Sequence, residues 1–291
     1  MTVKNPFSKD FDSAKDTELI IRAIDGNSKA LNELVQRHNN FIYNVAIKML
    51  GKADAEDATQ DILIKVITNL SSFDPDKAQF RTWLYRITFN HILNYKKSRP
   101  EKAIQSFDQF FGFIENLESQ EPNFGEQNFA LYSNETKMKC MHGMLMCLSR
   151  EQRLLFVVGD IFQIDHNLGA EIFGTTPTNF RKRLSRTRKE LVQWMDNKCG
   201  LVNKNNPCRC PKKTKGFIRQ GIVDPENLLW EHEYKNKIGD FTESKFHDTL
   251  RSQDDVYRKL YQEQPFVETK SAEKVMEEIL GNDTLKEFLN L

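Results

Sequence analysis

The chain has few of the features that mark membrane, secreted and β-rich proteins. Its 291 residues contain no apolar run of the length that spans a bilayer, and the first residues, MTVKNPFSKDFDS, lack the apolar core of a signal peptide. Strand-like alternation of apolar and polar residues is almost absent between Asp16 and Arg99. We therefore expect a cytoplasmic, all-α protein without membrane insertion.

Cysteine is scarce and the net charge is close to zero. Five cysteines in a cytoplasmic chain are typical of thiols or metal ligands rather than disulfides. The net charge of +1 averages over two segments of opposite sign. Residues 177–219 carry 13 Lys and Arg against 2 Asp and Glu, a net charge of +11, whereas residues 224–291 carry 9 against 16, a net charge of −7. The first segment attracts phosphate and the second repels it.

The basic segment begins with a helix-turn-helix pattern. Gly174 supplies the turn, Thr176 is suited to cap the second helix, and Pro177 suits its first position. The helical period places Phe180, Leu184, Thr187 and Leu191 on one face, and it places a basic set on the other face: Arg181, Lys182, Ser185, Arg186 and Lys189. This pattern predicts a helix that reads a DNA major groove. The alternative is a solvated basic helix with no partner.

Residues 16–100 form a run of helical patterns. Asp54 is suited to cap a helix whose apolar stripe is Ala58, Ile62, Val66 and Leu70. The outer face of that helix brings together Asp57, Gln60 and Asp61. From the residues alone, an ordinary solvated surface explains this face.

A second helix is predicted from Phe80 to Arg99, where Pro100 ends it. Aromatic and cationic residues are interleaved in and before it: Phe73, Phe80, Trp83 and Tyr85 beside Lys77, Arg81 and Arg86. Such rings stack on unpaired bases while the cations hold phosphates, as in single-stranded DNA binding. The alternative is that the aromatic residues form a core.

Residues 101–135 lose helical periodicity and carry seven acidic residues against one lysine. This composition predicts a flexible acidic linker. Helical patterning resumes at residue 136 and continues into the helix-turn-helix. Two helical modules joined by an acidic tether are therefore expected.

The two modules together resemble small bacterial RNA polymerase sigma factors of the extracytoplasmic-function (ECF) group of the sigma-70 family. The first is similar to region 2 of that family through DAEDATQDI at 54–62 and FRTWLYRI at 80–87. The second is similar to region 4 through LSREQR at 148–153 and RLSRTR at 183–188. The resemblance implies an N-terminal tail (1–15), region 2 (16–100), an acidic linker (101–135), region 4 (136–197) and a C-terminal extension (198–291).

The resemblance also implies partners and residue roles. Asp57, Gln60 and Asp61 would bind core RNA polymerase, and an anti-sigma factor is a further expected partner. Melted minus-10 promoter DNA would contact residues of the loop and helix around position 80: Phe73, Asp74, Lys77, Gln79, Arg81, Trp83, Asn90 and Asn94. Arg181, Lys182, Ser185, Arg186 and Lys189 would contact the minus-35 duplex. The expected mechanism is binding, since no nucleophile with its base and no phosphate-cradling glycine loop is found.

The extension begins with a cysteine-containing segment that small sigma factors usually lack. Cys199, Cys208 and Cys210 lie in a turn-rich stretch and could supply three thiolates to zinc, with Cys140, Cys147 or His142 as the fourth ligand. The segment resembles the cysteine-rich tails of some metal-responsive family members, but its spacing is no standard zinc module. Redox-sensing thiols and inert cysteines are the alternatives.

Two other functions remain open from the sequence. One is a stand-alone helix-turn-helix regulator that binds duplex DNA without polymerase, and the other is a metal-dependent enzyme built on the cysteines, for which no general base is evident. The acidic tail, 224–291, is expected to regulate the protein in cis, by folding back on the basic reading helix, by docking to a partner or as a positive element.

Overall fold

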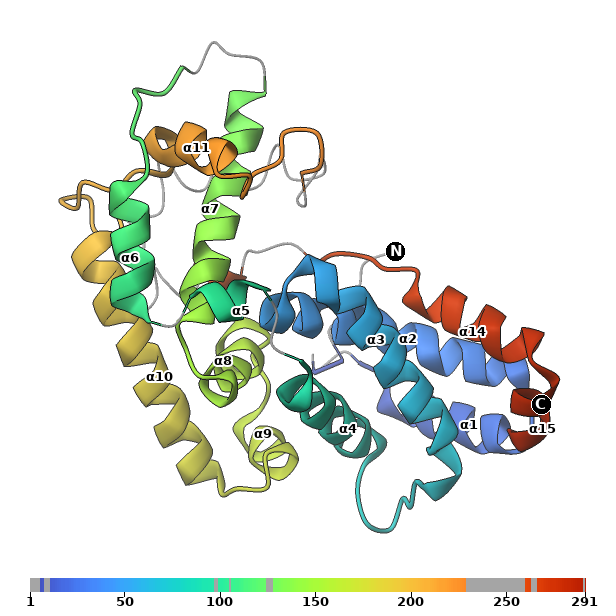
Figure 1. Ribbon diagram of the computed structural model, residues 1–291. Coiled ribbons are helices and arrows are strands. Elements are labelled where there is room, and N and C mark those ends of the chain that lie inside the picture. Colours follow the sequence, from blue (N-terminus) through green and yellow to red (C-terminus); the bar gives the residue numbers. More distant parts are fainter. Residues whose placement is uncertain are drawn as a thin grey trace. The chain divides into compact units, whose positions relative to one another are not determined.

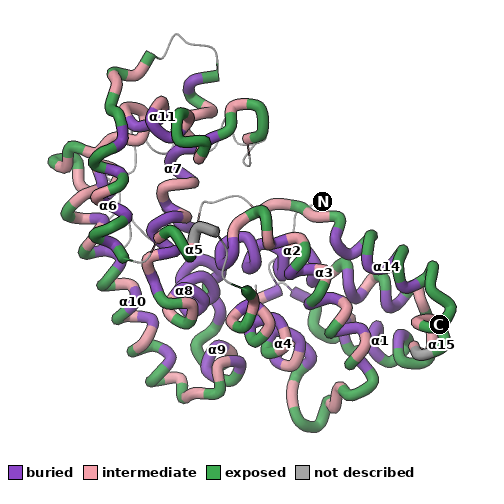
Figure 2. Tube along the Cα trace, in the orientation of Figure 1, coloured by how far each residue is buried: buried purple, intermediate pink, exposed green. Residues whose placement is uncertain are grey.

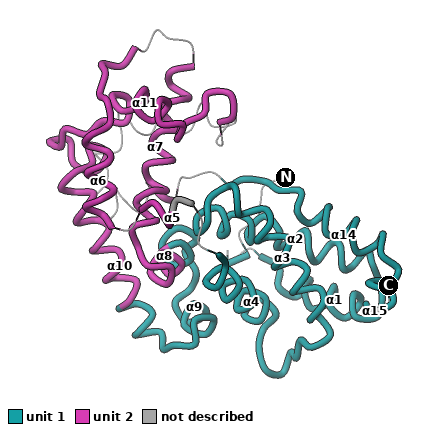
Figure 3. The backbone as a smooth tube through the Cα atoms, viewed as in Figure 1, with its two compact units in different colours: residues 1–98, 157–182, 266–291 teal, residues 99–156, 183–265 magenta. Residues whose placement is uncertain are grey.

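The computed structural model describes residues 6–7, 11–96, 99–104, 106–123, 128–228, 260–262, 266–289 and 291. Within these ranges the chain is helical and contains no strand, so the all-α fold class is confirmed. The chain forms two compact units, coloured separately in Figure 3. The first combines residues 1–98, 157–182 and 266–291, and the second combines 99–156 and 183–265. Among the described helices, none is both long and apolar enough to cross a membrane.

Four helices build most of the first unit: α1 (Ser13–Ile24), α2 (Ser28–Leu50), α3 (Lys52–Thr68) and α4 (Phe80–Asn94). Asp12 and Asn27 cap α1 and α2 through side-chain oxygens that accept backbone N–H groups. The prediction that Asp54 caps α3 is wrong, because α3 already begins at Lys52. Gly51 precedes it with a positive φ of 88°, which lets the chain turn directly from α2 into α3.

The predicted end of α4 at Arg99 is also wrong. The helix ends at Asn94, and Tyr95 has an extended backbone. Pro100 lies in the first turn of a separate short helix, α5 (Arg99–Ala103), where a missing N–H leaves no helical hydrogen bond unmade. The proline therefore begins a helix instead of ending one.

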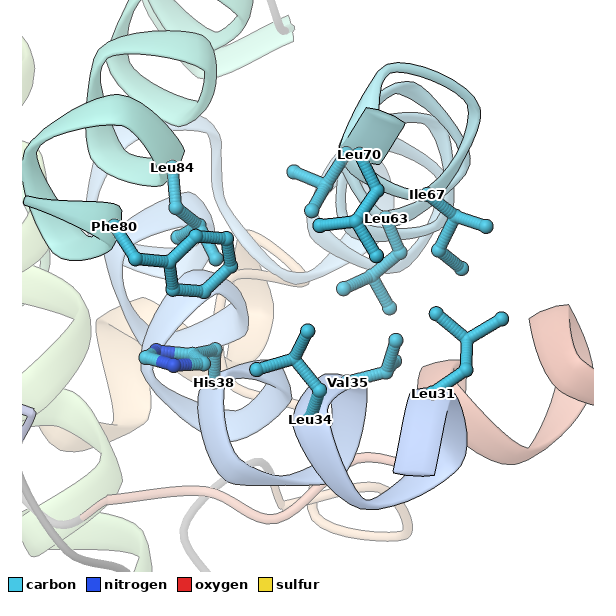
Figure 4. A pocket seen from close by; sticks show the side chains of 10 residues that line it. Leu31, Leu34, Val35, His38, Leu63, Ile67, Leu70, Phe80 and Leu84 are labelled. Carbon is cyan, nitrogen blue, oxygen red and sulfur yellow. The ribbon is translucent and has the colours of Figure 1, made fainter. Parts of the chain in front are cut away.

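Apolar side chains of α2, α3 and α4 meet in the core of the first unit. Figure 2 shows the buried stripes along these helices. Figure 4 shows the centre of this core, a cavity of about 10 Å³ lined by leucines, valines, isoleucine, Phe80 and His38. A cavity of this size holds at most one water molecule, so it is a packing defect and no ligand site.

The first unit also contains later parts of the chain. A π-helix, η2 (Val157–Ile161), leads to α9 (His166–Ile172) and the start of α10 (Pro177–Lys198). The C-terminal helices α14 (Ser271–Gly281) and α15 (Asp283–Phe288) belong to the same unit, and α14 packs on α2 and α3 (Figure 1). The part of the acidic tail between 229 and 259 lies outside the described residues.

The second unit contains α5, α6 (Phe107–Asn116), α7 (Phe129–Met146), α8 (Arg150–Phe156), α11 (Cys210–Arg219) and the rest of α10. Helix α6 corrects the prediction of a flexible linker at 101–135. Its acidic residues lie beside an apolar face that is buried, namely Phe107, Phe110, Phe111 and Ile114. Phe107 and Phe111 stack on Trp194, with ring centroids 5.5 and 6.0 Å away. The acidic composition of the segment suggested a linker and gave no indication of this apolar face.

A buried ion-pair cluster fixes α5 to α8. Glu101 accepts hydrogen bonds from Arg150 at 2.7 and 2.8 Å and from Arg153 at 3.0 Å. The Glu101 side chain is 5% exposed and that of Arg153 is 3% exposed. Arg153 also donates to the carbonyl oxygens of Leu145, Met146 and Leu148, which end α7. The beginning of the predicted linker is thus part of the core of the second unit.

The segment after α10 folds back along α6 and α7. Helix α11 packs on α7, and Lys213 donates to the carbonyl oxygens of Glu115 and Leu117 at 3.1 and 2.7 Å. The last turn of α10 is extended by a compact loop in which Gly200 N–H donates to Cys208 O at 3.1 Å. The first part of the C-terminal extension is therefore ordered and joined to the supposed linker.

Candidate nucleic-acid interface

Helices α9 and α10 form the predicted helix-turn-helix. Thr176 Oγ1 accepts a hydrogen bond from Asn179 N–H at 3.2 Å, Pro177 is the first residue of α10, and Gly174 has a φ of 61°. The predicted inner face is buried, with Phe180, Leu184, Thr187 and Leu191 all at most 2% exposed. Cap, turn and buried face are therefore confirmed.

The two helices approach closely where a glycine faces an aromatic ring. A Cβ atom on Gly169 of α9 would lie 2.6 Å from Cζ of Phe180. The Phe180 ring is held on its other sides by Phe173 and His166, at centroid distances of 5.6 and 5.9 Å. Only glycine permits this spacing of α9 and α10.

Gly169→Ala is expected to lower the free energy of unfolding by about 1–3 kcal/mol, because a methyl group must displace the Phe180 ring in a packed core. Urea denaturation followed by circular dichroism measures this. Gly112→Ala in α6 is the control, since a Cβ there meets nothing within 4 Å and the change should stabilise the helix by about 0.5–1 kcal/mol. Equal stability of the two variants would contradict the contact.

The outer face of α10 carries cations. Arg181, Lys182, Arg186 and Lys189 are exposed and Ser185 is half-buried, so all five predicted positions lie on the accessible side. Among the described residues none of the four cations forms an ion pair. Their charges are therefore available to phosphates or to guanine edges.

The loop before α4 and the first turn of α4 form an aromatic cluster. Trp83 lies 5.7 Å from Phe73 and 5.7 Å from Phe80, nearly parallel to Phe80. Phe73 and Trp83 are half-buried, so part of each ring is accessible. Of the predicted aromatic set, Phe80 and Tyr85 are instead buried in the core, where the Tyr85 hydroxyl lies 3.0 Å from His38 Nδ1. The helical face of these two residues pointed inward, as the core alternative expected.

Polar residues surround this aromatic cluster. Asp74 and Lys77 form an exposed ion pair at 2.8 Å, and the hydrogen bond from Lys77 holds the pKa of Asp74 below its usual value. Gln79, Asn90 and Asn94 are exposed. Asn94 donates to the carbonyl oxygen of Asn90 at 2.8 Å, along α4.

Arg81 faces the N-terminal segment instead of open solvent. It donates to Pro6 O at 2.6 Å and lies over the Phe11 ring at 5.9 Å. Arg81 and Gln79 border a cavity of about 450 Å³, whose wall is completed by residues of the N-terminus and of α9: Phe7, Phe11, Ser13, Asp165, Asn167, Leu168 and Glu171. This cavity mixes aromatic rings, an arginine and two carboxylates.

The predicted polymerase face of α3 is accessible. Asp57 and Asp61 are exposed and Gln60 is half-buried. His91 of α4 lies 3.6 Å from Asp61 and 2.7 Å from Lys65, and burial together with the Lys65 charge lowers its pKa. The aspartates therefore remain the charged groups that a partner would meet.

The cysteines are free thiols in the second unit. Cys199 and Cys208 pair through their backbones, and Cys140, in α7, and Cys210 are half-buried. Burial raises the pKa of Cys199 to about 11 and that of Cys147 to about 12. Within the described ranges no three His, Cys, Asp or Glu side chains form a group that could hold a metal ion, and this holds for His142 as well. The zinc hypothesis gains no support from this arrangement.

Several known proteins are similar to part of the chain. The family model described as sigma-70 region 2 matches residues 34–100. The ECF RNA polymerase sigma factor SigE of Mycolicibacterium smegmatis is 26% identical over 165 residues, which are 56% of this chain and 61% of that protein. RNA polymerase sigma factor CnrH of Cupriavidus metallidurans is 26% identical over 185 residues, 62% of this chain and 94% of CnrH.

One further relative has a higher identity over a shorter stretch, and one solved structure is also similar to the chain. The ECF RNA polymerase sigma-E factor of Escherichia coli is 38% identical over 80 residues, 28% of this chain and 41% of that protein. The structure of CnrH in complex with the cytosolic domain of CnrY covers 62% of this chain and 97% of the CnrH chain, with 22% identity and a TM-score of 0.46. Residues 34–100 thus match sigma-70 region 2, and the chain is similar to sigma factors of the ECF group.

Proposed function

We propose that the protein is a sigma factor that binds core RNA polymerase in the cytoplasm and directs promoter recognition and transcription initiation. The observation that carries the proposal is a helix-turn-helix with an exposed basic face on the same chain as a region 2 helix pair. The protein would act by binding, without catalysing a reaction. An anti-sigma factor is a further proposed partner.

Each surface has a distinct task in this proposal. The basic face of α10 binds the minus-35 duplex, with arginines on guanine edges or phosphates. Phe73 and Trp83, half-buried beside exposed Lys77 and Gln79, hold unpaired bases of the minus-10 element by stacking. The exposed aspartates of α3 bind polymerase.

A stand-alone DNA-binding regulator is the competing function. It would have no use for the accessible Phe73 and Trp83 rings or for the acidic face of α3. Transcription in vitro with core polymerase on a genomic promoter library separates the two functions, because only a sigma factor gives promoter-dependent transcripts with core enzyme. Duplex binding without such transcripts would favour the regulator.

Asp57→Lys and Asp61→Lys are each expected to weaken association with core polymerase about tenfold. Reversing one charge on a complementary surface opposes encounter and removes an attractive contact. Pull-down of polymerase at several salt concentrations measures the effect. Asp25→Lys, an exposed aspartate at the end of α1, is the control with the same charge change. Equal recovery of polymerase by all three variants would show that the α3 face does not bind polymerase.

A further inference from the structure

Asparagines of helix α2 bind the backbone of a segment that follows them by more than 220 residues. Asn44 Nδ2 donates to Val267 O at 2.8 Å, and Val267 N–H donates to Asn44 Oδ1 at 2.9 Å. Two residues further on, Asn39 donates to Thr269 O at 3.0 Å, and Thr269 N–H donates to Asn40 Oδ1 at 3.1 Å. Alternate residues of an extended chain direct their backbone groups to the same side. The asparagine amides thus bind the segment as a neighbouring strand would.

The amides of Asn39 and Asn44 are buried and bind the tail, and Asn44 Nδ2 also donates to Asn40 O at 2.7 Å. Asn39 and Asn44 are each 1% exposed. A buried amide without its partner costs about 1–3 kcal/mol. Since the contacts are to backbone atoms, they select an extended peptide and not one side-chain sequence. We call this site, formed by Asn39, Asn40 and Asn44, the peptide site of α2.

Apolar anchors flank the bound segment on both sides. After it, α14 buries Ala272, Val275, Met276 and Ile279, and Lys274 forms an ion pair with Glu56 of α3. Before it, the Phe266 ring lies 5.4 Å from Phe162 and 6.4 Å from Phe41. Phe41 and Phe162 are themselves 4.8 Å apart. Phe266 therefore covers the contact between α2 and the residue that follows η2.

That contact holds α9 on the helix proposed to bind single-stranded DNA. Arg86 of α4 donates to Glu171 O of α9 at 2.7 Å, and Phe89 lies 5.7 Å from Phe173. The minus-10 and minus-35 elements are separate segments of the promoter, and each base pair between them adds about 3.4 Å. A chain bound to both elements cannot keep α9 against α4. The contact between these two helices must open before promoter binding.

We propose that residues 266–269 are an intramolecular latch, bound in the peptide site of α2, that holds η2 and α9 against α2 and α4. The latch keeps α9 on Arg86 and Phe89 of α4 until polymerase or a competing extended peptide displaces it. Its effect on DNA binding rests on the proposed function, whereas occupation of the peptide site and retention of α9 do not.

Val267→Pro tests the latch in the full chain. Proline removes the N–H that Asn44 accepts and leaves α2 unchanged. Glu268→Pro is the matched control, because the Glu268 side chain is exposed and its N–H donates no hydrogen bond to any residue that the structure describes. Amide hydrogen exchange of the free protein is the first measurement. We expect Val267→Pro to speed exchange about tenfold in α14 and in α9 together, and Glu268→Pro to leave both unchanged.

The possible outcomes test the latch independently of the proposed DNA binding by α4. Faster exchange in α14 alone, or in neither helix, would overturn the latch. A second measurement is the affinity for a fluorescein-labelled single-stranded DNA of mixed sequence, expected to rise about tenfold in Val267→Pro. Released α9 with unchanged DNA affinity would support the latch and overturn the assignment of α4 to DNA binding. Asn44→Ala removes the same hydrogen bonds from the side of α2. It should speed amide exchange in α14 and α9 as Val267→Pro does.

Discussion

Replacing Glu101 by alanine is expected to lower the free energy of unfolding of the second unit by about 3–5 kcal/mol. Two arginines share this carboxylate, and Arg153 would remain 3% exposed without its counter-ion. Removing one partner of a buried ion pair typically costs about 3–5 kcal/mol. Burial already lowers the pKa of Arg153, and the Glu101 charge opposes that effect. Urea denaturation followed by tryptophan fluorescence gives the change in stability.

An exposed ion pair of the same unit is the matched control for Glu101. Glu115 pairs with Lys198 at 2.5 Å, but its side chain is 58% exposed. Glu115→Ala should cost no more than about 1 kcal/mol, because solvent screens the pair. If Glu101→Ala were as mild as Glu115→Ala, the cluster would not stabilise the packing of α5 on α8. Trp194, which stacks on Phe107 and Phe111, lies in this unit, so its fluorescence follows the unfolding of the unit.

The double variant Arg181→Glu, Arg186→Glu should weaken binding to a minus-35 duplex by about 2–6 kcal/mol. Each arginine is exposed on α10, and one base contact is worth about 1–3 kcal/mol. Loss of phosphate contacts should also reduce the slope of log affinity against log salt by about one for each contact. Fluorescence anisotropy with a labelled duplex at several salt concentrations separates the two kinds of contact.

Lys29→Glu controls for one of the two charge reversals, since Lys29 is exposed at the start of α2 and far along the chain from α10. We expect it to leave duplex affinity within about twofold of the parent, because a distant exposed charge is screened at physiological salt. A double variant with parental affinity and an intact helical signal would show that α10 does not read DNA.

Local signals made the helix-turn-helix predictable. The cap of Thr176, the turn at Gly174 and the buried period of Phe180 to Leu191 all lie within 18 residues, and each is confirmed. The start of α3 was misplaced because Asp54 is a good capping residue that lies three positions after the true cap, Gly51. The packed face of α6 was missed because acidic composition outweighed the four apolar residues on that face.

Contacts between distant segments could not be predicted from sequence. Asn39, Asn40 and Asn44 look like ordinary polar positions of a helix, and no local pattern connects them to Val267. We expected the acidic tail to fold back on the reading helix α10. The described end of the tail instead packs on α2 and α3 through α14. The assignment of individual residues to polymerase and promoter DNA stays a prediction, as does the division into regions.

The long separation between α2 and its bound segment has a consequence during synthesis. Asn44 leaves the ribosome 223 residues before Val267. At about 5–20 residues per second, this interval lasts about 10–45 s. Each nascent chain therefore completes α2 with its peptide site empty, and a ligand present at that moment meets no competition from the tail. Regulation by the latch would begin only when the molecule is nearly finished, so newly made and mature molecules would differ in their readiness to bind partners.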